Sequence, residues 1–351
     1  MKIGILTVHD SIVNYGSFLQ AVSLYEFLEN EGHTAYFIYK DSKESLLKKY
    51  YYNNHRNPIK KINTYLTESS KLKKKYNLFY KEWKNYRLLY YQDIQILDLV
   101  VCGSDELWNI RNKDVYDNYY YGEFVQSMPK IAYAISIGDS SKIDFINNKD
   151  KVKLIKEFNS ISARDINTSN TLQEFNIITA ENVCDPTVLR IQSFYKNVTP
   201  CTGEYILVYS YGFDKRISKL IKKFATKNNL KIISPLMDCS IASEVPYVSC
   251  LEFLSLIKGA KYVITSTFHG ALLSALLNVN VSVYCTKSKT KEILNKYRLA
   301  HKEITLNMSD EEFKEVLNRP IDYIITNKYI NEDRIKSQKI LRKQLEEITH
   351  G

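Results

Sequence analysis

A short polar turn at residues 265–270 holds the side chains that are best placed to do chemistry. It reads Thr-Ser-Thr-Phe-His-Gly and contains His269 and Gly270. The apolar, β-branched run before it is typical of a buried strand, and the Ala/Leu-rich run after it is typical of a buried helix. The turn therefore ends a strand and begins a helix. At such a place the first backbone N–H groups lack a partner within the helix, and the helix dipole is positive.

This setting favours anions, and phosphate above all. The dipole disfavours a charged histidine until a bound phosphate favours the imidazolium. Such a histidine is suited to donate a proton in a reaction that releases phosphate, so we predict that His269 is catalytic. A phosphorylated donor would contact the rest of the turn: Thr265, Ser266, Thr267, Phe268 and Gly270. The alternative is a simple turn whose imidazole is hydrogen-bonded to a neighbour.

The first predicted strand, residues 2–7, is followed by a loop that opens a predicted helix at 17–30. Asn14, Tyr15 and Gly16 end this loop, and Asn and Gly tolerate the dihedral angles that a tight loop needs. We predict that the three residues contribute to donor binding through the loop's amide groups. The loop has no GxGxxG or Walker pattern of a phosphate-binding loop.

Two other predicted strands end in side chains that suit a sugar or an anion. After residues 97–102, Ser104 and Asp105 can hydrogen-bond hydroxyls, Asp105 can act as a base, and Trp108 offers a flat apolar face to a sugar. The alternative is a capped turn with Trp108 in the core. After residues 158–163, Arg164 can hold a carboxylate or phosphate through two hydrogen bonds. Its alternative is a surface pair with Asp165.

Composition sets limits on the class of protein. The chain has 351 residues, 44% of them hydrophobic, and a net charge of +10, which allows two domains and favours anionic partners. No run is long enough for a signal peptide or a membrane span, so we expect a cytoplasmic protein, with peripheral contact to an anionic membrane as an option. The six cysteines are scattered and no metal-ligand motif is present, so we expect no disulfides, metal or cofactor.

Strand-like and helix-like segments alternate along most of the chain, which predicts an α/β fold. One series of alternating strands and helices precedes a Pro-containing joint at residues 185–203, and a second series follows it. The two series predict two Rossmann-like domains that face a cleft, at 1–190 and 200–325. A C-terminal helix is predicted at 326–351. One expected strand is 181–184. Residues 41–93, rich in Lys and Tyr, interrupt the alternation. They are interpreted as a helical insertion, or else as a basic surface for anionic lipid or carbohydrate; no signature supports nucleic acid.

Several motifs in this order resemble the polysaccharide pyruvyl transferase family over about residues 1–300: NYG at 14–16, GSDELWN at 103–109, YAISIG at 133–138, ISARD at 161–165, CDPTVL at 184–189 and TSTFHGALLSALL at 265–277. The resemblance implies a GT-B-like arrangement and transfer of a pyruvyl group from phosphoenolpyruvate to sugar hydroxyls, often as a ketal. It implies roles for His269 in catalysis and for Arg164 toward the donor. The acceptor would be a lipid- or nucleotide-linked saccharide.

One position departs from the family pattern. Family members often carry an arginine two residues before the histidine, and this chain has Thr267 there. Donor binding would then need Arg164 and further cations, such as Lys287, Lys289 or Arg298. Two other functions stay open. One is a nucleotide-sugar glycosyltransferase of the same two-domain shape, and the other is a non-catalytic module that binds carbohydrate or lipid.

Overall fold

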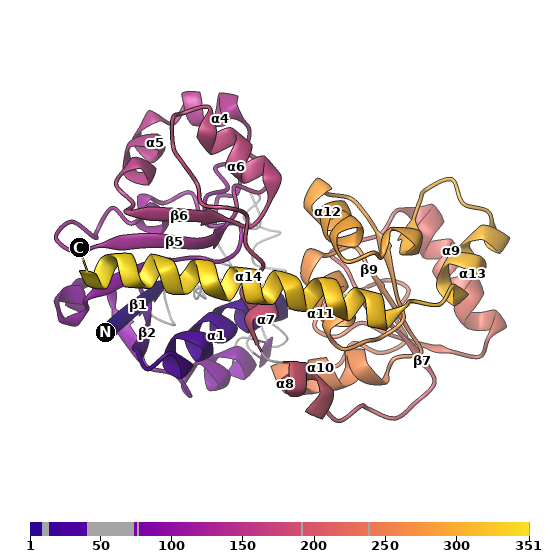
Figure 1. Cartoon of the computed structure of the whole chain (residues 1–351). Helices are drawn as coiled ribbons and strands as arrows, with labels where there is room; N and C mark the ends of the chain where they lie inside the picture. The colour runs from indigo at the N-terminus through magenta and orange to yellow at the C-terminus, as the bar shows by residue number, and fades with distance from the viewer. Residues whose placement is uncertain (9–13, 41–73, 76, 191, 238, 351) are drawn as a thin grey trace, which may run out of the picture. The chain divides into compact units, whose positions relative to one another are not determined.

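The computed structural model describes residues 1–8, 14–40, 74–75, 77–190, 192–237 and 239–350. The chain divides into two compact units. Unit 1 comprises residues 1–190 and 334–351, and unit 2 comprises residues 191–333. Each unit contains one parallel sheet with helices packed around it (Figure 1). The predicted α/β class with two Rossmann-like domains is therefore confirmed.

The sheet of unit 1 has the strand order β3-β2-β1-β4-β5-β6, which is the order of a Rossmann fold. Its apolar runs are buried along almost their whole length, as expected for parallel strands that are covered on both faces. The strand order reverses between β1 and β4, so this edge of the sheet is where ligands of such folds bind. The strands are β1 (Lys2–Leu6), β2 (Thr34–Tyr39), β3 (Leu88–Tyr90), β4 (Leu99–Cys102), β5 (Lys130–Ile135) and β6 (Ser160–Ala163).

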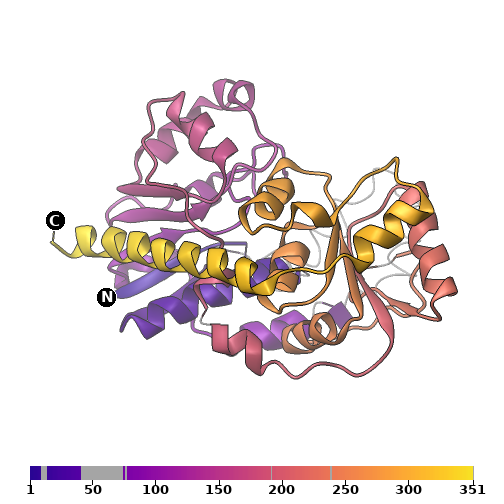
Figure 2. The same cartoon turned by 45° about the vertical axis from the view of Figure 1, so that its right-hand side comes forward.

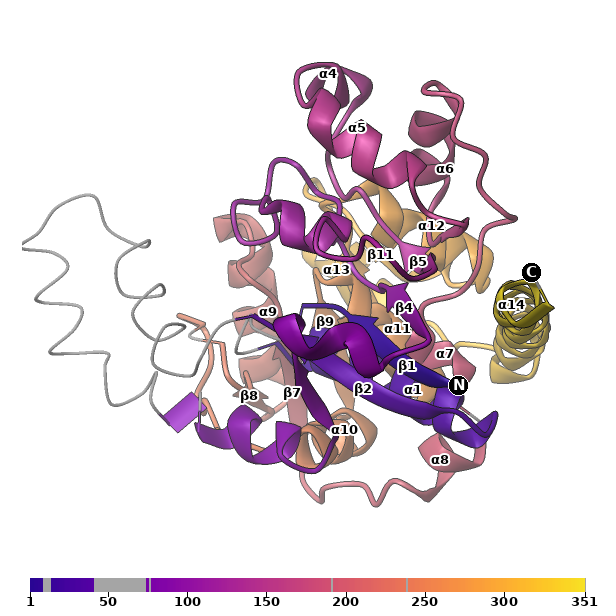
Figure 3. The same cartoon turned by 90° about the vertical axis from the view of Figure 1, so that its left-hand side faces the viewer.

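Helices connect these strands and cover the sheet of unit 1. α1, α4 and α6 each follow a strand, so their N-termini lie at the carboxyl edge of the sheet. Figure 3 shows the strands β1 and β2 with α1 beside them. The helices are α1 (Tyr15–Asn30), α4 (Lys142–Ile146), α5 (Lys149–Lys156), α6 (Ile166–Gln173) and α7 (Pro186–Leu189), with 3-10 turns η1 (Tyr91–Ile96) and η2 (Asn118–Tyr121).

The long helix α14 (Tyr323–His350) completes unit 1 with its C-terminal half. Its Gln344 donates a hydrogen bond to Ser160 Oγ at 2.9 Å. The prediction of a strand at 181–184 is wrong, because α14 packs against this segment. Val183 N still bonds to Ala163 O of β6 at 2.9 Å, but Cys184 N donates to the hydroxyl of Ser337 on α14 at 2.8 Å, so the helix takes the place of a further strand.

The sheet of unit 2 has the order β11-β10-β9-β7-β8, in which the order reverses between β7 and β9. Figure 1 shows α9 and α13 on one side of this sheet and α10, α11 and α12 on the other, and the turned view of Figure 2 agrees. The strands are β7 (Tyr205–Tyr209), β8 (Lys231–Ile233), β9 (Tyr262–Thr265), β10 (Val281–Tyr284) and β11 (Glu303–Ile304). The helices are α8 (Gln192–Asn197), α9 (Lys215–Lys227), α10 (Cys250–Gly259), α11 (Phe268–Leu276), α12 (Ser288–Lys296) and α13 (Asp310–Asn318), with the 3-10 turn η3 (Ala300–Lys302).

Most of the predicted insertion at 41–93 lies outside the described residues, and so does much of the Lys/Tyr-rich sequence that was interpreted as a basic surface. Its last part is built into unit 1. Residues 77–83 are helical, and the buried ring of Trp83 packs edge-on against Phe18 and Phe37, at centroid distances of 4.7 and 4.9 Å. Residues 88–90 then form the edge strand β3. This part of the segment therefore contributes to the hydrophobic core and to the sheet of unit 1.

Candidate active site

In unit 1, α1 begins at the carboxyl end of β1, where the strand order reverses between β1 and β4. Asn14 caps this helix, because its Oδ1 accepts hydrogen bonds from the N–H groups of Gly16 at 2.9 Å and Ser17 at 3.3 Å. The Tyr15 ring is fully buried and lies 5.3 Å from the Phe79 ring, centroid to centroid. The side chains of Asn14 and Tyr15 thus serve the fold, which leaves the backbone as the means by which these residues would contact a donor.

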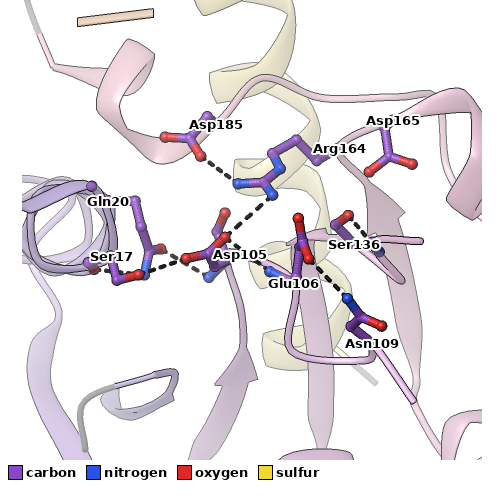
Figure 4. Close-up of polar contacts among 12 residues, drawn as sticks. Ser17, Gln20, Asp105, Glu106, Asn109, Ser136, Arg164, Asp165 and Asp185 are labelled. Carbon is purple, nitrogen blue, oxygen red and sulfur yellow. Dashed lines mark hydrogen bonds and ion pairs between the residues drawn. The ribbon is translucent and has the colours of Figure 1, made fainter. Parts of the chain in front are cut away.

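Asp105 stands at the centre of this edge, directly after β4 (Figure 4). Its Oδ2 accepts a hydrogen bond from Ser17 Oγ at 2.7 Å, and its Oδ1 accepts one from Glu106 N at 2.9 Å. Its φ of 86° is in the region that non-glycine residues rarely adopt, although Asp tolerates it better than most. The side chain is 16% exposed, so the carboxylate is held firmly but is still accessible.

Arg164 holds the other side of the Asp105 carboxylate. Its guanidinium lies 3.4 Å from Asp105 Oδ1 and 2.8 Å from Asp185 Oδ2, and its side chain is buried (Figure 4). Burial by itself would lower the pKa of Arg164, but the two carboxylates raise that pKa above its ordinary value. The predicted contact of Arg164 with a donor carboxylate is therefore corrected. Two carboxylates of unit 1 already pair with this cation, and it positions Asp105.

The neighbouring carboxylates each cap a helix. Asp185 caps α7 by accepting a hydrogen bond from Thr187 N at 3.0 Å, and Asp165 caps α6 by accepting one from Thr168 N at 2.9 Å. The alternative of an exposed Arg164–Asp165 pair is therefore also wrong. Asp185 therefore has a structural role, through its cap and its bond to Arg164.

The predicted sugar platform is contradicted by burial. Trp108 is 0% exposed, donates its Nε1–H to Tyr120 O at 3.2 Å, and stacks on Tyr121 with ring centroids 6.2 Å apart. An indole with no exposed surface offers no face to a sugar, so the core alternative holds. Ser104 is also fully buried, and its N–H donates to Gln20 Oε1 at 3.1 Å. Its predicted acceptor contact is corrected for the same reason.

Sequence reasoning missed Gln20 and Ser17, which join α1 to the end of β4. Gln20 Nε2 also donates to Thr7 Oγ1, at 3.0 Å, so one amide ties both central strands to the helix. The available signal was a glutamine inside the apolar run Phe-Leu-Gln-Ala-Val of a helix that is buried on most sides. A buried polar side chain in such a run needs partners.

In unit 2, the turn at 265–270 lies where the sequence predicts it, between β9 and α11. Thr265 Oγ1 donates to Tyr209 O at 2.6 Å, which ties the ends of β9 and β7 together. Thr267 caps α11, because its Oγ1 accepts a hydrogen bond from Gly270 N at 3.0 Å. The turn therefore occupies the point of strand-order reversal in the unit 2 sheet.

His269 is the second residue of α11 and is 7% exposed. Its ring meets Phe268 edge-on, with centroids 5.1 Å apart. Nearby, the hydroxyls of Ser210 and Ser266 lie 2.6 Å apart across the ends of β7 and β9. Ser210 was not predicted, although its position directly after an apolar strand was the available signal. The arrangement gathers a histidine, two hydroxyls and a helix N-terminus, which is suited to a phosphorylated ligand.

Of the three cations proposed as substitutes for the family arginine, Lys289 is the best placed. It lies in the first turn of α12, and its Nζ is 5.4 Å from the ring centroid of Phe268, next to His269. Lys287 is the N-cap of the same helix. Arg298 follows the other end of α12 and donates to Tyr329 Oη at 2.9 Å. The predicted role of Arg298 toward the donor is therefore not supported.

Comparison with known families identifies the family of this chain. A family model described as polysaccharide pyruvyl transferase matches residues 14–284, which is more than half of the 351 residues. The chain belongs to this family. The match includes Asp105, Arg164 and the turn with His269. Comparison with curated proteins gives no match.

Solved structures show the same fold at low identity. The UDP-GlcNAc 2-epimerase of Neisseria meningitidis, bound to UDP-GlcNAc, is similar with a TM-score of 0.56 and 11% identity, over 99% of this pyruvyl transferase family member and 100% of that chain. The 2-epimerase of Rickettsia bellii has a TM-score of 0.53 and 11% identity, over 100% and 97%. An α-glucosyltransferase in complex with UDP and DNA has a TM-score of 0.54 and 9% identity, over 99% of each chain. These enzymes share the GT-B-type fold.

A glycine is required where α11 approaches β9. A Cβ added to Gly270 would lie 2.2 Å from Thr265 Oγ1 and 2.7 Å from Thr267 Oγ1. We expect Gly270→Ala to lower the free energy of unfolding by about 1–3 kcal/mol, measured by urea denaturation. In an unobstructed helix the same change stabilises by about 0.5–1 kcal/mol. A more stable variant would contradict the close approach.

The buried pair of Arg164 and Asp185 predicts a large stability effect in unit 1. Asp185→Asn keeps a capping oxygen for α7 but removes a carboxylate from the buried guanidinium, so we expect a loss of about 3 kcal/mol in urea denaturation. Glu181→Gln is the matched control, because the side chains of Glu181 and Lys336 are 72% and 48% exposed in their ion pair. The control should not change stability measurably. Equal effects of the two variants would show that Asp185 is not held in a buried pair.

Proposed function

We propose that this member of the family transfers a pyruvyl group from phosphoenolpyruvate to hydroxyls of a sugar in a polysaccharide precursor, forming a ketal. The observation that carries the proposal is the place of His269 in the first turn of α11, where the strand order of unit 2 reverses. Ligands of doubly wound sheets bind at such a point. A ligand that binds at this point of the sheet, next to the positive end of the helix dipole, would contact the histidine.

The donor binds to unit 2 in this proposal. Its phosphate lies against the N-terminus of α11, where the positive end of the dipole favours negative charge. The hydroxyls of Ser210 and Ser266 add hydrogen-bonding groups, and Lys289 adds a positive charge that Thr267 does not supply. Because amide groups, hydroxyls and a lysine meet the phosphate charge, the proposed reaction needs no metal ion or other cofactor.

The chemical step starts at the methylene carbon of phosphoenolpyruvate. His269, in its imidazolium form beside the phosphate, donates its proton to this carbon, which becomes a methyl group. Positive charge then develops on the adjacent carbon, and the oxygen of a sugar hydroxyl attacks it. A base takes the proton of that hydroxyl. A second hydroxyl of the sugar then attacks the same carbon and the C–O bond to phosphate breaks. The proton of this hydroxyl leaves with the inorganic phosphate, which completes the ketal.

The acceptor binds to unit 1 in this proposal, and Asp105 is the base. Its carboxylate is accessible and is fixed by Ser17 and Arg164, so one orientation is favoured for a sugar hydroxyl. The buried Trp108 takes no part. A saccharide linked to a lipid or to a nucleotide fits the proposal, because both present a sugar with free hydroxyls.

The decisive experiment incubates the purified protein with phosphoenolpyruvate and a panel of lipid- and nucleotide-linked sugars. We expect inorganic phosphate to be released together with a product whose mass is that of the acceptor plus one pyruvyl ketal unit. His269→Gln should lower the rate of phosphate release by about 10²–10⁴-fold, because the proton donor is lost. His301→Gln is the control: His301 lies in the same unit, with its ring bonded to Pro320 O at 3.2 Å.

The result also separates the other two functions. A glycosyltransferase would release nucleotide from a UDP-sugar and would not respond to phosphoenolpyruvate; the UDP-bound structures that share this fold are the reason to include UDP-sugars in the panel. A non-catalytic binding module would bind sugar without releasing phosphate. Full activity of His269→Gln would contradict the assigned proton donor even if the product is a ketal.

A further inference from the structure

The helix α9 (Lys215–Lys227) is the most strongly charged element of unit 2. It contains no acidic residue, and its six cations are Lys215, Arg216, Lys219, Lys222, Lys223 and Lys227. The opposite side of the helix is buried in the core through Ile217, Leu220, Ile221, Phe224 and Ala225. A helix anchored by five apolar side chains presents its cations in a fixed direction.

Five of the six cations form two rows with different surroundings. Arg216 and Lys223 lie on the flank that faces α13: Arg216 donates to Met308 O at 2.9 Å, and Lys223 forms an ion pair with Asp310. Lys215, Lys219 and Lys222 have the spacing i, i+4, i+7 and are all exposed, on the side opposite the buried residues. Among the described residues, none makes a hydrogen bond or ion pair with these three lysines. The carboxylate of Asp310 has a coulombic interaction with Lys219 without forming an ion pair with it.

We propose that this row, Lys215, Lys219 and Lys222, docks unit 2 onto a membrane surface that contains anionic phospholipid. The row is straight and spans about 10 Å, because a helix rises about 1.5 Å per residue. It consists of lysines, which act as mobile point charges, whereas recognition of one defined phosphate or carboxylate is the usual task of arginine forks. Aromatic residues do not alternate with the lysines, as they would in a site for single-stranded nucleic acid.

The end of the row lies close to the candidate active site along the chain. α9 starts after the loop that follows β7, at the same edge of the sheet as Ser210 and the N-terminus of α11. Tyr211, in this loop, is 75% exposed, and tyrosine is enriched where proteins meet the headgroup region. Docking through α9 would therefore place the Lys215 end of the row, and the loop with Tyr211 beside it, near the membrane. The proposal concerns binding alone and does not depend on the reaction.

The test measures co-sedimentation of the full-length protein with vesicles. We expect binding to vesicles of phosphatidylcholine and phosphatidylglycerol in a ratio of about two to one, and not to pure phosphatidylcholine. The variant with Lys215→Gln, Lys219→Gln and Lys222→Gln should bind roughly a hundredfold more weakly, because each cation near an anionic surface contributes about 1 kcal/mol and about 1.4 kcal/mol is tenfold. Binding should also fall between about 0.1 M and about 1 M salt, as the Debye length shrinks from about 10 Å to about 3 Å.

The matched control removes the same charge from unit 1. Lys149, Lys153 and Lys156 are exposed on α5, and their triple change to Gln should leave most vesicle binding intact. Thermal melting checks that both variants are folded. Equal binding of the two variants would overturn the proposal, because charge alone and not α9 would then be responsible. The α9 variant losing affinity for a single-stranded oligonucleotide, but not for vesicles, would overturn it in favour of nucleic acid.

Discussion

The reversal of strand order between β7 and β9 is the constraint on which the candidate site depends. The chain leaves β7 toward one side of the sheet to form β8, and it returns to the other side to form β9. In doubly wound sheets, the point at which the strand order reverses in this way is where ligands bind. The hydrogen bond from Thr265 Oγ1 to Tyr209 O holds the two strand ends together, and Gly270 lets α11 start close against them. His269 owes its position to both.

Unit 1 has the same kind of edge, between β1 and β4, but its side chains make a different environment. In unit 2 the groups at the edge are hydroxyls, a histidine, a helix N-terminus and a nearby lysine, which are the kinds of group that bind an anion. In unit 1 the cation Arg164 is neutralised by Asp105 and Asp185, and the accessible charge is the carboxylate of Asp105. The edge of unit 2 suits a phosphorylated ligand, and the edge of unit 1 suits a hydroxyl group that gives up its proton.

The sequence was sufficient where local pattern determines structure. The turn with His269 could be predicted because an apolar strand, a capping threonine and an Ala/Leu-rich helix follow each other within a few residues. The roles of Arg164 and Trp108 could not, because they depend on partners that are distant in the chain: Asp185, Asp105 and Tyr121. A strand-end arginine looks the same in sequence whether it faces solvent or two carboxylates. Likewise, the apolar residues Val183 and Cys184 indicated a strand, and only the packing of α14 decides that there is none at 181–184.

Hydrogen exchange of the protein with and without phosphoenolpyruvate tests the central claim most directly. Amide exchange reports local opening and protection at the segment level, so it locates a ligand without requiring turnover. If the donor binds at the N-terminus of α11, saturating phosphoenolpyruvate should slow exchange in residues 266–270, and the effect should be lost in His269→Gln or be weaker there. Protection confined to residues 103–109, or no protection at all under conditions in which the enzyme releases phosphate, would contradict the account.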